Sequence, residues 1–204
     1  MLKLYHAPRT RSARVIWLLE ELGDVAYEVI ETPFKVPTDH IHHQNTPRGK
    51  FPTLDDDGLI LFESGAIIDH ILYHHGRGRL QPETGTAEWA LYRQWFTFAE
   101  STGATAINVL LWYLYMERDV PGAENVIARM QGWVEDNITA FADGLGAQQY
   151  IVGDSFTAAD IMMGYTLNMM TGAGSAFPAN VQAYFDRITT RPSFEIAMAG
   201  EPFR

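Results

Sequence analysis

The sequence has no cysteine, and this absence excludes disulfides, thiolate metal sites and a nucleophilic protein thiol. Basic residues are few as well: 15 Lys and Arg stand against 25 Asp and Glu, giving a formal net charge of −10. A nucleic-acid-binding protein usually carries a basic face, so we expect no nucleic-acid partner. No apolar run approaches the roughly 20 residues of a membrane span, and the first residues lack the apolar core of a signal peptide. The sequence therefore predicts a cytoplasmic protein without a membrane partner.

The 204 residues have an ordinary globular composition, with 47% hydrophobic residues, so the chain is long enough for one large domain or two small ones. The net charge is −2 over residues 1–80 and −8 over residues 81–204, so the acidic excess is concentrated in the second part. Glycines, a proline and two arginines cluster between residues 76 and 82, which is typical of a helix end followed by a linker. We therefore predict domains at 1–78 and 87–204, joined by a linker at 79–86.

The first predicted domain alternates strand and helix signals. Strand patterns cover residues 2–5, 25–31, 51–54 and 59–62. Apolar residues at helical spacing predict a helix over residues 12–22 and another that begins at Ser64. The last two strands are expected to pair antiparallel through a four-residue loop, because so short a connection cannot cross over. The predicted order is β-α-β, a long irregular stretch, and then β-β-α.

The second predicted domain shows only helical patterns. Residues 86–116 form one long pattern rich in aromatic residues, and Pro121 is expected in the first turn of a helix that runs to about Asp143. Thr157 is a natural N-cap, and Asp160 stands where it can return the hydrogen bond of a capping box. Further helices are expected near residues 178–190 and 193–199.

Four blocks of sequence carry a resemblance to a known family. They are residues 12–23 (SARVIWLLEELG), 45–54 (NTPRGKFPTL), 61–67 (LFESGAI) and 153–160 (GDSFTAAD). In this order and at these separations the chain resembles the glutathione transferase superfamily. The resemblance implies an α/β plus all-α fold, in which a thioredoxin-like βαβ-ββα N-terminal domain precedes an all-helical C-terminal domain. It also implies a homodimer, glutathione as co-substrate and no tightly bound cofactor.

The resemblance further implies a set of glutathione contacts. In the family the bond at the position of Phe51-Pro52 is cis, and the turn exposes backbone groups of the preceding residue to the cysteinyl part of glutathione. Ser64 and its backbone N–H would bind the γ-glutamyl carboxylate at a helix N-terminus, with Glu63 assisting at the amine. Lys50 would meet the glycine carboxylate.

The group that activates the glutathione thiol is left open by the sequence. Hydroxyl donors, cations and a helix N-terminus all stabilise a thiolate. Three hydroxyls qualify: Thr10 falls where serine-type relatives keep their active residue, Ser12 is close by, and Tyr5 ends the first strand as in tyrosine-type relatives. Arg11 and backbone N–H groups are the remaining option. The lack of cysteine excludes a mixed disulfide on the protein.

The resemblance predicts a glutathione transferase that conjugates reduced glutathione to a small hydrophobic electrophile, as in detoxification. By resemblance, Asn108, Trp112 and Tyr113 contribute to the electrophile site. Two alternatives stay open: a glutathione-dependent peroxidase or disulfide reductase, and a non-catalytic ligand- or protein-binding member of the fold. Paired histidines at positions 70 and 74 lack the glutamate of a zinc-protease motif, so we expect no metal.

Overall fold

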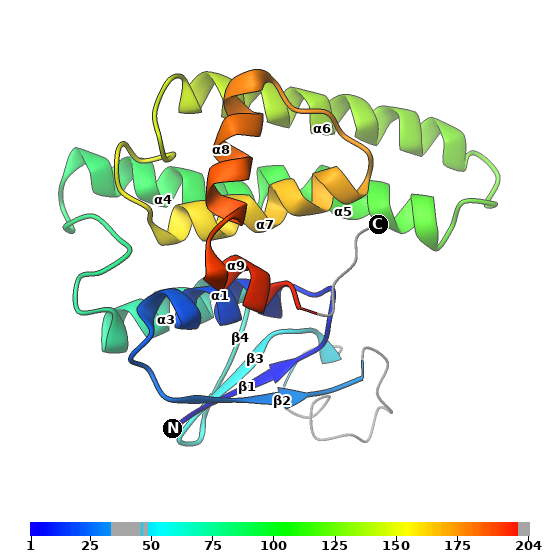
Figure 1. The fold of residues 1–204 in the computed structure, drawn as a ribbon. Coiled ribbons are helices and arrows are strands. Elements are labelled where there is room, and N and C mark those ends of the chain that lie inside the picture. The colour runs from blue at the N-terminus through cyan, green and yellow to red at the C-terminus, as the bar shows by residue number, and fades with distance from the viewer. Residues whose placement is uncertain (34–45, 47–48, 200–204) are drawn as a thin grey trace. The chain divides into compact units, whose positions relative to one another are not determined.

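The computed structural model describes residues 1–33, 46 and 49–199 (Figure 1). These residues form two compact units. The first contains Met1–Leu80 together with residues 190–199, and the second contains Gln81–Thr189. Residues 190–199 therefore belong to the same unit as residues 1–80. The predicted domain limits at 78 and 87 stay a proposal.

A four-stranded mixed sheet forms the base of the first unit, in the order β2-β1-β3-β4. The strands are β1 (Leu2–His6), β2 (Tyr27–Glu31), β3 (Thr53–Asp56) and β4 (Leu59–Phe62). β1 runs parallel to β2 and antiparallel to β3, and β3 is antiparallel to β4. This confirms the predicted βαβ-ββα order, although the second and third strands each begin two residues later than predicted.

The loop between β3 and β4 corrects the sequence prediction. Asp56 pairs with Leu59, so the loop contains only Asp57 and Gly58 rather than four residues. Both adopt left-handed backbone conformations, with φ of 49° and 96°. Two positive φ values are the signature of the tight turn that matches the twist of a hairpin, and Asp-Gly is a preferred sequence for it. The Asp55 side chain accepts a hydrogen bond from the Gly58 N–H at 2.8 Å.

Helices cover one face of this sheet (Figure 1). They are α1 (Ser12–Leu22) and α3 (Ser64–Ile71) with its short π-helical continuation η2 (Leu72–Gly76), while α9 (Pro192–Ala197) packs on α1. The α1 helix is buried along most of its length because α9 packs against it as well. Trp17 and Phe194 meet edge to face, with ring centroids 4.9 Å apart. Beside them, Arg191 donates two hydrogen bonds to Glu21, at 2.5 and 2.6 Å, and Ser193 donates another.

The second unit is a bundle of five helices. They are α4 (Ala87–Glu100), α5 (Thr102–Tyr115), α6 (Ala123–Leu145), α7 (Ala158–Gly172) and α8 (Ala179–Thr189). α7 is apolar around most of its circumference because α4, α5 and α8 all pack against it. The predicted capping box at its start is present, with Asp160 accepting from the Thr157 N–H at 2.8 Å. Such a closed N-terminus lets a helix begin inside the bundle without orphaned backbone donors.

Two helix predictions in this unit were wrong. The long pattern over 86–116 is interrupted at Ser101, which has φ −100° and ψ −82° and separates α4 from α5. The Ser101 hydroxyl donates to the Thr97 carbonyl at 2.7 Å, a side-chain bond of the kind that competes with helical geometry. Pro121 does not lie in the first turn of α6, because Gly122 occupies the N-cap position with a left-handed φ of 84°.

Among the residues that the structure describes, no helix combines the length and apolar character that crossing a bilayer requires.

Candidate functional site

The register of three strands gathers segments that are far apart in the sequence. Tyr5 at the end of β1 pairs with Thr53 at the start of β3, and Thr53 pairs with Phe62 at the end of β4. Neighbouring strands are about 4.8 Å apart. The loop after β1, the turn before β3 and the junction after β4 therefore meet at one end of the sheet. The candidate residues Thr10, Phe51-Pro52 and Glu63-Ser64 lie on these segments.

A cluster of hydrogen bonds occupies the loop between β1 and α1. The Thr10 hydroxyl donates to the Ala7 carbonyl at 2.7 Å and lies 2.6 Å from the Ser12 hydroxyl. Ser12 Oγ is in turn 2.7 Å from Nδ1 of His6, and Ala7 O lies 3.4 Å from Ser12 Oγ. The cluster is buried, so these groups depend on one another rather than on solvent for their hydrogen bonds.

Burial distinguishes the candidate hydroxyls. Ser12 is 0% exposed, whereas Thr10 retains 9% exposure. Ser12 is the first residue of α1 rather than its N-cap, a position that Arg11 takes without a side-chain cap. Tyr5 is half-buried and lies on the opposite face of β1 from His6, because side chains alternate along a strand. Thr10 is thus the residue of this pair that keeps some exposed surface, whereas Ser12 has none.

A buried arginine links α1 to the candidate carboxylate site at α3. Arg14 is 0% exposed, and its Nη1 donates to Ser64 Oγ at 3.1 Å. Ser64 is itself buried and is the first residue of α3. A serine at a helix N-terminus with a guanidinium beside it is suited to an anionic ligand, because free backbone N–H groups, the helix dipole and the cation act together.

Backbone strain marks the residue before Ser64. Glu63 is exposed, and its φ of 71° with ψ of 114° is unusual for a residue with a side chain. Such conformations cost about 1–3 kcal/mol and cluster at ligand sites, where they orient a particular backbone or side-chain group. The Phe51-Pro52 peptide is cis, as the resemblance implied. Lys50, just before it, is exposed.

The electrostatic setting of His6 follows from its place in the sheet. It ends β1, and its strand partner on β2 is Glu31. Burial lowers the pKa of the His6 imidazole, and the Glu31 charge opposes this effect only in part. The ring is therefore neutral at pH 7 and carries a single N–H.

His6 and Arg14 were not predicted as site residues, although each had a sequence signal. The period of two along β1 places His6 on the same buried face as Leu2 and Leu4. Arg14 lies four residues before Leu18 and shares its buried helix face. A polar residue on an apolar face needs a partner, but the sequence does not identify that partner.

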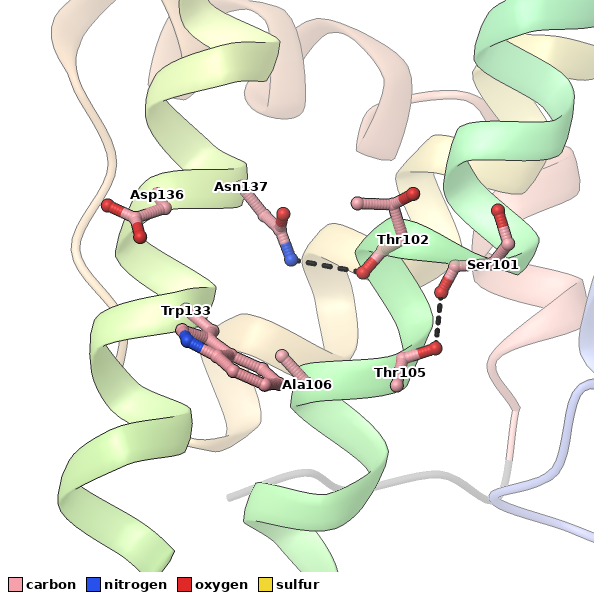
Figure 2. A pocket seen from close by; sticks show the side chains of 7 residues that line it. All are labelled: Ser101, Thr102, Thr105, Ala106, Trp133, Asp136 and Asn137. Carbon is pink, nitrogen blue, oxygen red and sulfur yellow. Dashed lines mark hydrogen bonds between the residues drawn. The ribbon is translucent and has the colours of Figure 1, made fainter.

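The predicted electrophile residues lie on the second unit. Asn108 and Trp112 are exposed neighbours one turn apart on α5, and Tyr113 is half-buried. A separate hollow of about 450 Å³ lies where the start of α5 faces α6. Figure 2 shows the Trp133 indole beside Ala106 and the Asn137 amide directed at the Thr102 carbonyl, to which it donates at 3.0 Å. This hollow is not lined by the predicted electrophile residues.

The histidines of α3 and η2 have a structural partner. His70 Nε2 lies 2.9 Å from an Asp56 carboxylate oxygen, and the His74 ring stacks at a tilt on His70 with centroids 4.5 Å apart. Among residues 1–33, 46 and 49–199, no three or more His, Asp or Glu side chains converge in a way that could hold a metal ion.

Comparisons with known proteins agree with the architecture. A model described as "Glutathione S-transferase, N-terminal domain" matches residues 4–80, and one described as "Glutathione S-transferase, C-terminal domain" matches residues 124–187. "Glutathione S-transferase 3" of Schizosaccharomyces pombe is 29% identical over 176 residues, which is 80% of this chain and 72% of that protein.

Solved structures show the same fold at lower identity. A glutathione transferase homolog from Lodderomyces elongisporus, with two GSH per subunit, has a TM-score of 0.87 and 20% identity, covering 98% of this chain and 99% of its own. Ure2p in complex with glutathione has a TM-score of 0.85 and 21% identity, covering 98% and 93%.

Proposed function

Because the chain belongs to the glutathione S-transferase superfamily, we propose that it conjugates reduced glutathione to a hydrophobic electrophile through a stabilised thiolate. The observation that carries the proposal is the register of β1, β3 and β4. It brings together a hydroxyl loop, a cis-proline turn and a helix N-terminus, the three kinds of group that a γ-glutamyl-cysteinyl-glycine ligand requires.

Each part of the tripeptide has a proposed partner. Ser64 Oγ and the N-terminus of α3 bind the γ-glutamyl carboxylate, and Arg14, which donates to Ser64 Oγ, adds a positive charge next to Ser64. Glu63 binds the γ-glutamyl amine. The backbone of Phe51, before the cis-proline, pairs with the cysteinyl unit as an added strand would. Lys50 provides a cation for the glycine carboxylate.

The proposed donor to the thiolate is Thr10. A free thiol has a pKa of about 8.5, so only a few per cent is ionised at pH 7. A hydroxyl donor at the sulfur lowers that pKa, and the α1 N-terminus and Arg11 add positive potential. Thr10 is favoured over Ser12 because Ser12 has no exposed surface. Tyr5, on the other face of β1, is the weaker candidate.

For the second substrate we propose contacts from Asn108, Trp112 and Tyr113, whose aromatic rings suit an apolar electrophile. The thiol proton is lost to solvent, and the thiolate then attacks a carbon of the electrophile directly. A C–S bond forms as the bond from that carbon to its leaving group breaks, and the leaving group departs with the electron pair. We further propose that the protein acts as a homodimer.

Calorimetric titration with reduced glutathione, combined with thiolate absorbance near 240 nm as a function of pH, tests the proposal. We expect binding and a bound-thiol pKa below that of free glutathione. Thr10→Ala should raise the bound-thiol pKa by about 1–2 pH units, because a hydrogen bond to a charged group is worth about 1.5–3 kcal/mol. Thr10→Ser should stay close to wild type, and Tyr5→Phe should have little effect.

Ser64→Ala serves as the matched control, because it should weaken glutathione binding while leaving the pKa of the remaining bound thiol nearly unchanged. Binding without a lowered thiol pKa would favour peroxide or disulfide chemistry instead. Failure to bind either reduced or oxidised glutathione would refute an enzymatic role and favour a ligand- or protein-binding function.

A further inference from the structure

The hydrogen bonds around Ser12 have a direction that follows from counting protons. Each hydroxyl carries one proton, and both lie near the Ala7 carbonyl, Thr10 Oγ1 at 2.7 Å and Ser12 Oγ at 3.4 Å. The shorter contact assigns the Thr10 proton to Ala7. In the 2.6 Å contact between the two hydroxyls Ser12 is therefore the donor. With that proton used, the 2.7 Å contact between Ser12 Oγ and His6 is donated by the His6 Nδ1–H. The bonds thus run from His6 to Ser12, from Ser12 to Thr10 and from Thr10 to Ala7.

This order matters when Thr10 faces a sulfur atom. If Ser12 donates to Thr10, the Thr10 hydroxyl can turn its proton from the Ala7 carbonyl to the sulfur and still accept the hydrogen bond from Ser12. If Ser12 instead points elsewhere, Thr10 can donate to Ser12, and its only proton is then directed away from the sulfur. The donor at the sulfur therefore depends on which way the Ser12 proton points.

The His6 ring is able to fix that direction. It is buried at the end of β1, so its orientation is set by the sheet rather than by solvent. Hydrogen bonds in such a chain also strengthen one another, by about 10–30% per bond in a low-dielectric site. A ring N–H donating to Ser12 makes Ser12 a better donor to Thr10, and Thr10 a better donor to the thiolate.

We propose that His6 is a positioning residue. By donating a hydrogen bond from Nδ1 to Ser12, it keeps the Ser12 hydroxyl donating to Thr10, so that the Thr10 hydroxyl is free to donate to the sulfur of bound glutathione. The inference rests on the proposed function, in which Thr10 is the thiolate donor. No proton leaves the chain of hydroxyls in this role, and His6 does not touch the substrate.

The test compares two replacements of His6 in the full-length protein. His6→Phe keeps a planar ring in a strand but removes the nitrogen, whereas His6→Asn places an amide N–H near the position of Nδ1. The pKa of bound glutathione is measured from the thiolate absorbance near 240 nm. Binding of S-methylglutathione, which has no ionisable thiol, reports whether the rest of the site is intact, and His74→Phe controls for loss of a histidine outside the cluster.

We expect His6→Phe to raise the bound-thiol pKa by about half a pH unit or more, and to lower kcat/KM at pH 6.5 by about threefold, with S-methylglutathione affinity unchanged. His6→Asn should recover most of that shift, and His74→Phe should show none. Equal thiol pKa values in wild type and His6→Phe would overturn the inference, as would a His6→Asn protein that behaves like His6→Phe. A wild-type protein that binds glutathione without lowering its thiol pKa would refute the proposed function itself, and this inference with it.

Discussion

Two glycines in the same helix should respond in opposite ways to the same substitution. Gly132 and Gly144 both lie within α6. A Cβ at Gly132 would have no atom within 4 Å, whereas a Cβ at Gly144 would stand 2.1 Å from Cζ2 and 2.6 Å from Cη2 of Trp95. We therefore expect Gly132→Ala to stabilise the protein and Gly144→Ala to destabilise it.

The magnitudes follow from helix propensity and from packing. Alanine is favoured over glycine inside a helix by about 0.8–1 kcal/mol, and this full gain is expected at position 132. At position 144 the gain is opposed by overpacking, which typically costs about 1–3 kcal/mol. Ordinary carbon contacts are about 3.5–4 Å, so the Trp95 ring would have to move by more than 1 Å. It cannot do so freely, because it packs edge to face on Phe98 and Phe141 at 5.2 and 5.6 Å.

Thermal unfolding followed by far-UV circular dichroism measures the difference. For a chain of this length 1 kcal/mol corresponds to about 2–4 °C in Tm, so the overpacking cost should separate the two variants by roughly 2–12 °C. Trp95→Phe supplies the control, because a smaller ring should reduce the cost of Gly144→Ala in the double variant. Equal Tm changes for the two alanine variants, or an unchanged cost in the Trp95→Phe background, would refute the packing argument.

Three further predictions concern buried polar groups. Burial alone would raise the pKa of Glu21, but hydrogen bonds from Arg191 and Ser193 outweigh it and lower the pKa below its ordinary 4.5. In urea unfolding at a series of pH values, the wild type should therefore lose stability below pH 4.5 more steeply than Glu21→Gln does. Asp160 accepts hydrogen bonds from the Ile151 N–H, the Tyr184 hydroxyl and both donors of Thr157. Urea unfolding should show that Asp160→Asn lowers the free energy of unfolding by about 3–5 kcal/mol and Tyr184→Phe by about 1 kcal/mol, and similar losses for the two would contradict this. Arg14→Met should weaken glutathione binding about tenfold in calorimetry, and its effect should not add to that of Ser64→Ala because both remove one contact; full additivity would show that Arg14 acts elsewhere.

Local sequence patterns were sufficient for most elements of the fold. The period of two in β1, the helical spacing of α1 and the capping box before α7 are each contained in a few adjacent residues. The errors came where two local signals compete. Asp57-Gly58 makes a tighter turn than the run of aspartates suggested, and Ser101 interrupts a pattern whose apolar spacing continues on both sides.

The candidate site was only partly predictable, because its polar partners are far apart in the chain. Motif positions gave Thr10 and Ser64 as candidates, which remain proposals, and the cis Phe51-Pro52 bond that the resemblance implied is present. The Arg14–Ser64 contact joins residues 50 positions apart, and no local pattern pairs them. His6 was identifiable as a buried polar residue, but its hydrogen bond to Ser12 depends on how the β1–α1 loop bends back.

The return of α9 to the first unit has a consequence for synthesis. Arg191 lies 170 positions after Glu21, so a ribosome has made most of the chain before this ion pair can form. Until then the emerging α1 helix lacks Phe194 against Trp17 and Arg191 against Glu21. Of the two units, the first is consequently the earlier to leave the exit tunnel and the later to be completed. A premature stop codon shortly before the codon for Arg191 would damage the unit that is translated earlier.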